Sequence, residues 1–345
     1  MSFSAALAAT LGAALALLVA GALTYGLVLS GPVDPPRARN VHRRPTPTSG
    51  GLAILAGTGA GLMLYALLAP TAPELRRLCF ALALAATLGF VGAVDDVLDL
   101  GAKPKLVIQA ALALLFCGFV ARVESLALAP GLVLPLGPVV GTLGSALWIV
   151  VAINAVNFMD GANGLAPGSM VIAFFALAAV ALAGGSEPLA AASLIAAAAG
   201  LGFLPWNLPG GRIFQGDAGA LFSGALFSAL ALLAAGKTGE SAVSVYAGPL
   251  LILPLLTDVF MTLSARAKRR VSLLEAHREH LYHRWLAKTG APHAAVSLRL
   301  WALMASSGAA ALVLQAAPVG WRASLLALAV AVSVVLWRRW SQRWR

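Results

Sequence analysis

Two adjacent aspartates at the end of an apolar run are the first residues of this sequence that could carry out chemistry. They lie in the stretch FVGAVDDVLDLGAKPKLVIQ, residues 90–109, where Asp95 and Asp96 are followed by Lys105. Paired carboxylates can hold Mg²⁺ or act as a base whose pKa is set by the neighbouring acid, and a lysine can neutralise a phosphate. Two alternatives stay open here: a solvated loop, and the Asp-Asp-x-x-Asp motif of a prenyl-diphosphate enzyme.

A second cluster supplies amide and carboxylate oxygens. In AINAVNFMDGANGLAPG, residues 152–168, Asn154, Asn157 and Asp160 recur every three residues. On a helix this spacing keeps them near one side, and such oxygens suit a hard cation. Helix capping is the alternative, but a cap does not need Asn154 and Asn157 inside the apolar run. The pattern therefore favours a cation site.

Two further aspartates lie at or within apolar runs. Asp217 stands in QGDAG, where a new apolar run begins, and Asp258 stands inside LPLLTDVF. Near Asp217 the small neighbours would let a diphosphate approach the backbone, although an N-cap alone also explains an aspartate there. An aspartate within an apolar stretch is costly and is a functional candidate, with a structural arginine partner as the alternative.

Basic residues gather in two segments. Histidines 277, 280 and 283 are spaced by three in AHREHLYHRW, with Arg278 and Arg284 beside them. Their basic neighbours favour a phosphate ligand over zinc, and a basic helix on the membrane surface is the alternative. The other segment, RARNVHRRPTPTSGGLAI, ends in glycines that could approach phosphates at a helix start, or it simply fixes membrane topology.

These residues must be positioned by membrane helices. The chain has 345 residues, of which 60% are hydrophobic and 11% are charged, and its mean hydropathy is +0.88. Soluble domains carry about a quarter charged residues. The sequence therefore predicts an all-α polytopic membrane protein, a single integral membrane domain over residues 1–345.

About eleven transmembrane helices are expected from the apolar windows long enough to cross roughly 30 Å of hydrocarbon. The windows are 4–30, 50–69, 77–95, 105–122, 139–157, 166–184, 188–205, 218–236, 243–265, 295–316 and 321–338. The first has no basic residue before it and is longer than a signal-peptide core, so we expect it to be retained.

Charge predicts the orientation of these spans. Of the 24 lysines and arginines, five fall on one side, namely Arg76, Arg77, Arg122, Lys237 and Arg322, and nineteen fall on the other. The positive-inside rule then places the N-terminus outside and the C-terminus in the cytoplasm. Cytoplasmic loops are expected near residues 31–49, 95–105, 157–166, 206–217 and 266–294. The net charge of +11 reflects these loops and does not indicate nucleic-acid binding.

All seven aspartates fall on or near the predicted cytoplasmic side, whereas the outer loops carry only Glu74, Glu124, Glu187 and Glu240. Acids at the ends of membrane spans more often mark ion or phosphate sites than loop solvation. The sequence thus predicts one site at the cytoplasmic face, with a cation.

Taken in order, these segments resemble the polyprenyl-phosphate N-acetylhexosamine-1-phosphate transferases. That family includes the enzymes that begin O-antigen and teichoic-acid linkage synthesis and the phospho-MurNAc-pentapeptide transferase. The resemblance rests on five elements between about Arg37 and Gly290: PTPTSGGLAI, GAVDDVLDLGAKPKL, NAVNFMDGANGLA, FQGDAGALFSG and REHLYHRW. The family's TPRGGG is TPTSGG here, and its HLHHR is HLYHR, with Tyr282 replacing the central histidine.

The resemblance implies a role for each candidate residue. Asn157 and Asp217 would be ligands of Mg²⁺, with Mn²⁺ as the alternative ion. Asp95, Asp96 and Asp160 would be the catalytic acids, the first two positioning or deprotonating the lipid phosphate. Substrate contacts would come from Lys105, Asn154, His280, His283 and Arg284.

The implied reaction is the transfer of an N-acetylhexosamine-1-phosphate from a UDP-sugar to polyprenyl (undecaprenyl) phosphate, with release of UMP. It would occur at the cytoplasmic face of the inner membrane and begin a cell-envelope polysaccharide such as the lipopolysaccharide O-antigen. The expected partners are the membrane, the lipid phosphate and the UDP-sugar, and a homodimer is left open.

Two other functions remain as alternatives. An intramembrane prenyltransferase would use Asp-Asp-x-x-Asp but would need a second aspartate-rich repeat, and the second cluster here has two asparagines instead. An ion-coupled transporter would need acids at mid-depth, whereas these residues gather at one face, and the sequence has no evident inverted repeat.

Overall fold

The structure is a computed structural model that describes residues 3–31, 33–34, 46–70, 74–236, 243–275 and 277–343. Its helices are α1 (Phe3–Ser30), α2 (Gly50–Leu68), α3 (Leu75–Leu98), α4 (Ala102–Phe119), α5 (Gly137–Phe158), α6 (Leu165–Ala183), α7 (Glu187–Asn207), α8 (Gly216–Ala235), α9 (Ala247–Leu251), α10 (Leu253–Lys268), α11 (Leu281–Thr289), α12 (His293–Ala316) and α13 (Arg322–Arg343). A 3₁₀ turn, Val319–Trp321, precedes α13. Two short hairpins complete the chain: β1 (Val33–Asp34) with β2 (Thr46–Pro47), and β3 (Ser125–Ala129) with β4 (Leu132–Pro135).

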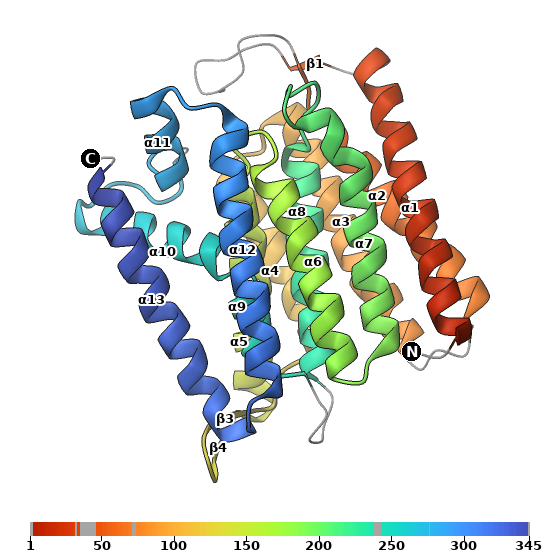
Figure 1. Ribbon diagram of the computed structural model, residues 1–345, viewed down its shortest axis with the longest axis vertical. Helices are drawn as coiled ribbons and strands as arrows, with labels where there is room; N and C mark the ends of the chain where they lie inside the picture. Colours follow the sequence, from red (N-terminus) through yellow and green to blue (C-terminus); the bar gives the residue numbers. More distant parts are fainter. Residues whose placement is uncertain are drawn as a thin grey trace.

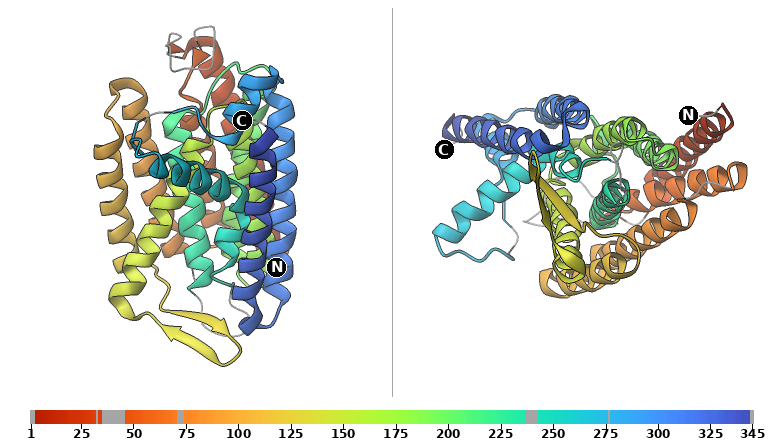
Figure 2. Two further views of the ribbon diagram at one scale, coloured as in Figure 1. Left: turned by 90° about the vertical axis from the view of Figure 1, so that its left-hand side faces the viewer. Right: turned by 90° about the horizontal axis from the view of Figure 1, so that it is seen from below.

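Long apolar helices dominate the described part of the chain, and most of them run side by side (Figure 1). Ten are long and apolar enough to cross a membrane: α1 to α8, α12, and α13 together with the turn before it. The prediction of an all-α polytopic membrane protein is therefore confirmed. α1 begins at the end of the bundle that carries β3 and β4, and α13 ends at the other (Figures 1 and 2).

The ninth expected span, residues 243–265, differs from the others because it is divided. α9 ends at Leu251, and α10 begins at Leu253 after a break at Ile252. Pro254 has no backbone N–H, so it cannot continue the hydrogen-bond ladder of α9. α10 then runs across the direction of the long helices (Figures 1 and 2) and leads into the loop before α11.

α8 is the central helix of the bundle. Of its most apolar 18 residues 94% are buried, against 6% for the corresponding stretch of Val319–Arg343. α8 packs against α2, α3 and α5, while α1 lies outside them against α2 and α7. Small residues allow this close approach: the backbone of Gly51 on α2 lies directly against that of Gly219 on α8. The start of α8 is thus surrounded by other helices.

The last helix, α13, is attached at its start and at its middle. At its start, Arg322 donates hydrogen bonds to the carbonyl oxygens of Gln315 and Ala317. At its middle, Ser333 pairs with Thr257 of α10 at 2.7 Å. A largely apolar cavity of about 520 Å³, lined by α13 residues from Leu325 to Trp340, separates α13 from α10 and α12.

Candidate active site at one end of the bundle

The turn between α3 and α4 brings the acid pair and Lys105 together. α3 ends at Asp99, which adopts a left-handed conformation with φ of 54° and donates its N–H to the carbonyl oxygen of Asp95. The Asp95 carboxylate accepts the next N–H, from Leu100, at 2.9 Å. The chain then reverses through Gly101 into α4, whose first turn carries Lys105.

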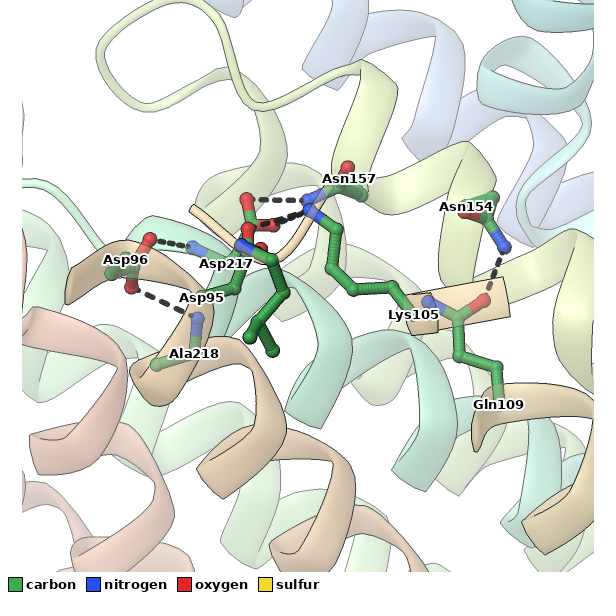
Figure 3. Close-up of polar contacts among 9 residues, drawn as sticks. Asp95, Asp96, Lys105, Gln109, Asn154, Asn157, Asp217 and Ala218 are labelled. Atoms are coloured by element: carbon green, nitrogen blue, oxygen red, sulfur yellow. Dashed lines mark hydrogen bonds and ion pairs between the residues drawn. The ribbon is translucent and has the colours of Figure 1, made fainter. Parts of the chain in front are cut away.

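Lys105 connects two carboxylates from different helices. Its Nζ lies 2.6 Å from Asp95 Oδ2 and 2.6 Å from Asp217 Oδ2 (Figure 3). The other oxygen of Asp217 accepts a hydrogen bond from Asn157 Nδ2 at 2.9 Å. These residues come from α3, α4, α5 and α8 and are as much as 122 positions apart in the sequence. We call the cluster of Asp95, Lys105, Asn157 and Asp217 the meeting point.

The second acid of the pair has a different environment from the first. The Asp96 carboxylate accepts the backbone N–H of Asp217 at 3.0 Å and that of Ala218 at 3.3 Å (Figure 3). These are unpaired N–H groups at the start of α8, so Asp96 caps that helix from outside it. Asp95 faces the lysine, and Asp96 faces the helix backbone.

Close backbone packing holds α3 and α2 against this helix start. At Gly92, a Cβ atom would collide with the backbone of Asp217 and Ala218. On the other side, Gly51 N–H donates to the carbonyl oxygen of Gln215 at 3.0 Å, and Phe214 N–H donates to that of Pro47 at 2.8 Å. The segment TPTSGG, residues 46–51, is thus attached to the residues that precede α8.

Two of the predicted residues stand apart from this meeting point. Asn154, one turn earlier on α5, donates to Gln109 Oε1 at 2.6 Å and to the carbonyl oxygen of Val150 (Figure 3). It ties α5 to α4 and does not contact Asp217. Asp160 follows α5; burial raises the pKa of its carboxyl, and the nearby negative charge of Asp217 raises that pKa further.

The histidine segment forms a stack of rings beside the end of α5. His280 is 2% exposed, and its ring lies 4.9 Å from that of His277 and 5.7 Å from that of Phe158, the residue after Asn157. The Tyr282 hydroxyl donates to the carbonyl oxygen of Phe158 at 3.0 Å. The histidine segment therefore contacts Phe158, the sequence neighbour of Asn157.

The remaining basic residues of this segment have distinct surroundings. Burial, together with the nearby His280 and Arg278, lowers the pKa of His283 to about 4. Burial and His280 likewise lower the pKa of His277 to about 4. The Arg284 guanidinium lies 5.5 Å from the ring centre of Trp337 on α13. The two histidines are therefore neutral near pH 7.

The donors present fit a hydrated Mg²⁺ better than a closed metal cage. Across the described ranges, no three histidine, cysteine, aspartate or glutamate side chains converge closely enough to hold an ion. Asp217 and Asn157 offer a carboxylate and an amide, and the Asp95 carboxylate already shares one cation with Asp217, the Lys105 ammonium. Mg²⁺ is commonly bound by one or two carboxylates, with water and substrate phosphates completing its shell.

Some contributors were not predicted as site residues. Gln109 is one, since an isolated glutamine in an apolar run has no distinguishing spacing. Trp337, which donates to Asp258, is another, because tryptophans near the ends of membrane helices are common for other reasons. Asp258 is one of the sequence candidates, because a charged side chain within an apolar run is energetically unfavourable. The basic residues 37–44 lie outside the described residues.

Comparison with known proteins connects this geometry to a family. The profile described as glycosyl transferase family 4 matches residues 78–235, which span α3 to α8 and carry Asp95, Lys105, Asn157 and Asp217. A Bacillus subtilis protein named "Probable undecaprenyl-phosphate N-acetylglucosaminyl 1-phosphate transferase" is 33% identical over 262 residues, covering 74% of this chain and 70% of the relative.

Two further relatives extend the similarity. A decaprenyl-phosphate N-acetylglucosaminephosphotransferase of Mycolicibacterium smegmatis is 30% identical, with 89% of this chain and 81% of the relative covered. A phospho-N-acetylmuramoyl-pentapeptide-transferase of Granulibacter bethesdensis is 30% identical, with 78% and 79% covered. Because the shared helices include those that form the meeting point, the chain belongs to glycosyl transferase family 4.

Proposed function

We propose that this protein transfers an N-acetylhexosamine-1-phosphate from a UDP-sugar to polyprenyl phosphate. The observation that carries the proposal is the convergence of Asp95, Lys105, Asn157 and Asp217 at the start of α8. The relatives named above support the substrate classes, since their names specify undecaprenyl or decaprenyl phosphate and N-acetylglucosamine or phospho-N-acetylmuramoyl-pentapeptide.

In the proposed step, an oxygen of the lipid phosphate attacks the β-phosphorus of the UDP-sugar. A new phosphorus–oxygen bond forms, and the bond from the β-phosphorus to the bridging oxygen breaks, so that UMP leaves with the electron pair. The products are polyprenyl-diphospho-sugar and UMP. Such phosphoryl transfers depend on positioning and on stabilisation of charge more than on covalent participation by the protein.

Asp217 and Asn157 would hold Mg²⁺ against the diphosphate, with Mn²⁺ as the alternative ion. When bound, the ion supplies Lewis-acid stabilisation of the charge that develops on the leaving phosphate. At the start of α8 the Asp96 carboxylate already accepts the N–H groups of Asp217 and Ala218, so only the helix dipole would add to the stabilisation of a phosphate there. Gly216 lies against Asp96 and Thr48, and Gly219 lies against Gln215 and Gly51, so these glycines serve close packing within the protein.

Lys105, Asp95 and Asp96 would each have a separate role in the reaction. The Lys105 ammonium, held between two carboxylates, is placed to pair with a substrate phosphate. Asp95 shares that ammonium and is the acid best placed to orient the acceptor phosphate or take its proton. Asp96 would act through Asp217, because it holds the backbone N–H of that residue.

The nucleotide-sugar would lie against the ring stack that includes His280 and His283. Since the pKa of His283 is about 4, this imidazole is neutral near pH 7 and acts there as a hydrogen-bonding group. Positive charge would come from Arg284. Asp160, whose pKa is raised by burial and by the charge of Asp217, completes the proposed catalytic acids.

In the membrane, the divided segment of α9 and α10 would act as the ninth of eleven crossings. The N-terminus would then lie outside and the C-terminus and the site on the cytoplasmic face of the inner membrane, in agreement with the distribution of lysine and arginine. Light scattering of the purified protein would test the homodimer.

The test is to identify the nucleotide released when purified protein is mixed with Mg²⁺, undecaprenyl phosphate and each of several UDP-N-acetylhexosamines. We expect UMP, formed fastest from the native sugar. Release of UDP would mean ordinary glycosyl transfer and would overturn the proposal. Pyrophosphate released from a prenyl diphosphate, without UMP from any sugar, would support the prenyltransferase instead.

A further inference from the structure

A buried carboxylate outside the metal and phosphate site lies at the centre of a separate network. Asp258 of α10 is 5% exposed and contacts three groups from other elements. Its Oδ1 accepts the backbone N–H of Leu281 at 3.0 Å and the indole N–H of Trp337 at 2.7 Å. Its Oδ2 lies 3.2 Å from Nδ1 of His280.

The first of these contacts places the start of α11. His280, at the N-cap position just before that helix, does not cap it with its own side chain. Asp258 does so from a neighbouring helix, where the negative charge is also favoured by the helix dipole. Glu279, the residue before His280, holds the same end of the loop to α10 through ion pairs with Arg266 and Arg269.

The second contact orients the His280 ring. A carboxylate at ion-pair distance from Nδ1 favours the tautomer with its proton on that nitrogen, as in other carboxylate–histidine pairs. Nε2 is then left as a hydrogen-bond acceptor. Both ring nitrogens are buried, and within the described part of the chain neither makes a hydrogen bond of good geometry; Nδ1 has the Asp258 oxygen at 3.2 Å, whereas no such neighbour of Nε2 is found there. The ring also lies against Phe158, the neighbour of Asn157.

The third contact comes from the last membrane helix. Trp337 of α13 fixes the Asp258 oxygen that also receives Leu281 N–H, and its ring lies below the guanidinium of Arg284. α13 is peripheral, yet its Trp337 indole touches the segment beside the candidate active site. The Ser333–Thr257 pair, one turn away on α13, joins the same two helices without contacting Asp258.

We propose that Asp258 is a positioning residue that holds His280 with Nε2 available to the nucleotide-sugar, and that Trp337 of α13 fixes the Asp258 carboxylate in that position. The role in substrate binding rests on the function proposed above. The pairing of Asp258 with His280 does not, because it follows from the contacts alone.

The kinetic test uses Asp258→Asn, in which an amide N–H₂ replaces one acceptor oxygen and can face His280 only if the imidazole moves its proton to Nε2. We expect the KM for the UDP-sugar to rise by about 10- to 100-fold, the usual range for loss of such a supporting contact, with a smaller fall in kcat. Trp337→Phe should raise the same KM by roughly tenfold, as expected for loss of a hydrogen bond to a charged group.

Matched controls distinguish an effect on the position of Asp258 from a general loss of contact between α13 and α10. Ser333→Ala removes another contact between α13 and α10, and Trp340→Phe changes a tryptophan of the same helix that lines the neighbouring cavity. Both should leave the KM within about twofold of the original, because neither touches Asp258. Equal effects from all four variants, or an unchanged KM in Asp258→Asn, would overturn the proposal.

A spectroscopic test does not depend on activity. The chain has five histidines, so ¹⁵N-histidine spectra of the protein in nanodiscs, compared with those of His280→Gln, isolate the His280 signal. We expect the Nδ1–H tautomer in the original protein and the Nε2–H tautomer in Asp258→Asn. An identical tautomer in both would overturn the pairing. If no UDP-sugar gives UMP, the proposed function fails, while these spectra still decide the pairing.

Discussion

At the scale of single residues, the candidate site is a cluster in which one ammonium, that of Lys105, lies between two carboxylates. Asp217 has the most partners: one of its oxygens contacts Lys105, the other accepts from Asn157, and its N–H reaches Asp96. A change at this position therefore disturbs residues from three other helices at once. The effect of removing only its charge is the sharpest residue-level test.

We expect Asp217→Asn to lose at least about 100-fold in Mg²⁺-dependent turnover while expressing normally, because the amide keeps the size of the side chain but removes the charge facing Lys105. UMP release across a magnesium titration measures this. Asp99→Asn is the control, since asparagine tolerates the left-handed conformation at that turn. Near-normal activity of Asp217→Asn would remove Asp217 from the metal site.

The pH dependence of stability is a second residue-scale prediction. The pKa of His283 falls from 6.5 to about 4 on burial, so the unfolded chain binds the proton more tightly than the folded protein. This group's contribution to stability is complete above pH 6.5 and is lost as the pH falls towards 4. The melting temperature should drop over that range, and His283→Gln should reduce the drop. An unchanged drop would contradict the burial of a neutral His283.

At the scale of elements, the start of α8 is the feature that unites the site. The end of α3 supplies its cap, α2 packs against its first turn, and α4 and α5 contact its aspartate. None of these elements forms the site alone. Changes in the contacts between elements should therefore affect function even where no predicted site residue is altered.

The Asp96 cap gives a direct prediction for this helix start. Asp96→Ala should lower the free energy of unfolding by about 0.5–2 kcal/mol, as for other lost caps, and speed amide hydrogen exchange at Asp217 and Ala218. Asp95→Ala should reduce turnover but leave those two amides protected, since Asp95 does not contact them. Hydrogen exchange resolved by residue distinguishes the two acids. Equal exposure of these amides in both variants would argue against separate roles.

Packing between α2 and α8 can be tested with glycines on one helix. At Gly51, an added Cβ would collide with the backbone of Gly219, so Gly51→Ala should destabilise the protein and reduce turnover. At Gly59, a Cβ would meet nothing within 4 Å, so Gly59→Ala should be neutral or stabilise by up to about 1 kcal/mol. Thermal unfolding of the two variants measures the difference. Similar melting temperatures would contradict the close contact.

At the scale of the whole molecule, the two ends of the described chain lie at opposite ends of the bundle (Figure 1). Chain ends on opposite sides of a membrane require an odd number of crossings. The ten long helices give such a number if the divided segment of α9 and α10 is counted as one further crossing. The site, the histidine stack and the end of α13 then share one face, while the β3–β4 hairpin lies at the other.

Fusion reporters test this sidedness. Alkaline phosphatase joined after residue 345 should be inactive, because the enzyme needs an oxidising compartment to form its disulfides and we expect a cytoplasmic C-terminus. The same reporter inserted at the turn between β3 and β4 should be active. An active C-terminal fusion would contradict the predicted orientation.

Much of this architecture could be predicted from the sequence, because apolar windows and clustered aspartates are local signals. Ten of the expected spans appear as single long helices, and Lys105, Asn157 and Asp217, which come from three separate segments of the sequence, lie in contact. The break at Ile252 was missed, since hydropathy does not register a change of direction. The different surroundings of Asp95 and Asp96 were also missed, because they depend on which face of α3 meets α8.

The cavity between α13 and its neighbours has a practical consequence for purification. Because this space of about 520 Å³ is largely apolar, we expect apolar chains of lipid or detergent to enter it in a membrane or a micelle. The side chains of Trp337 and Trp340 border this space. Samples prepared in different detergents should therefore differ in what supports the last helix, and comparisons among variants require one detergent and a matched lipid content throughout.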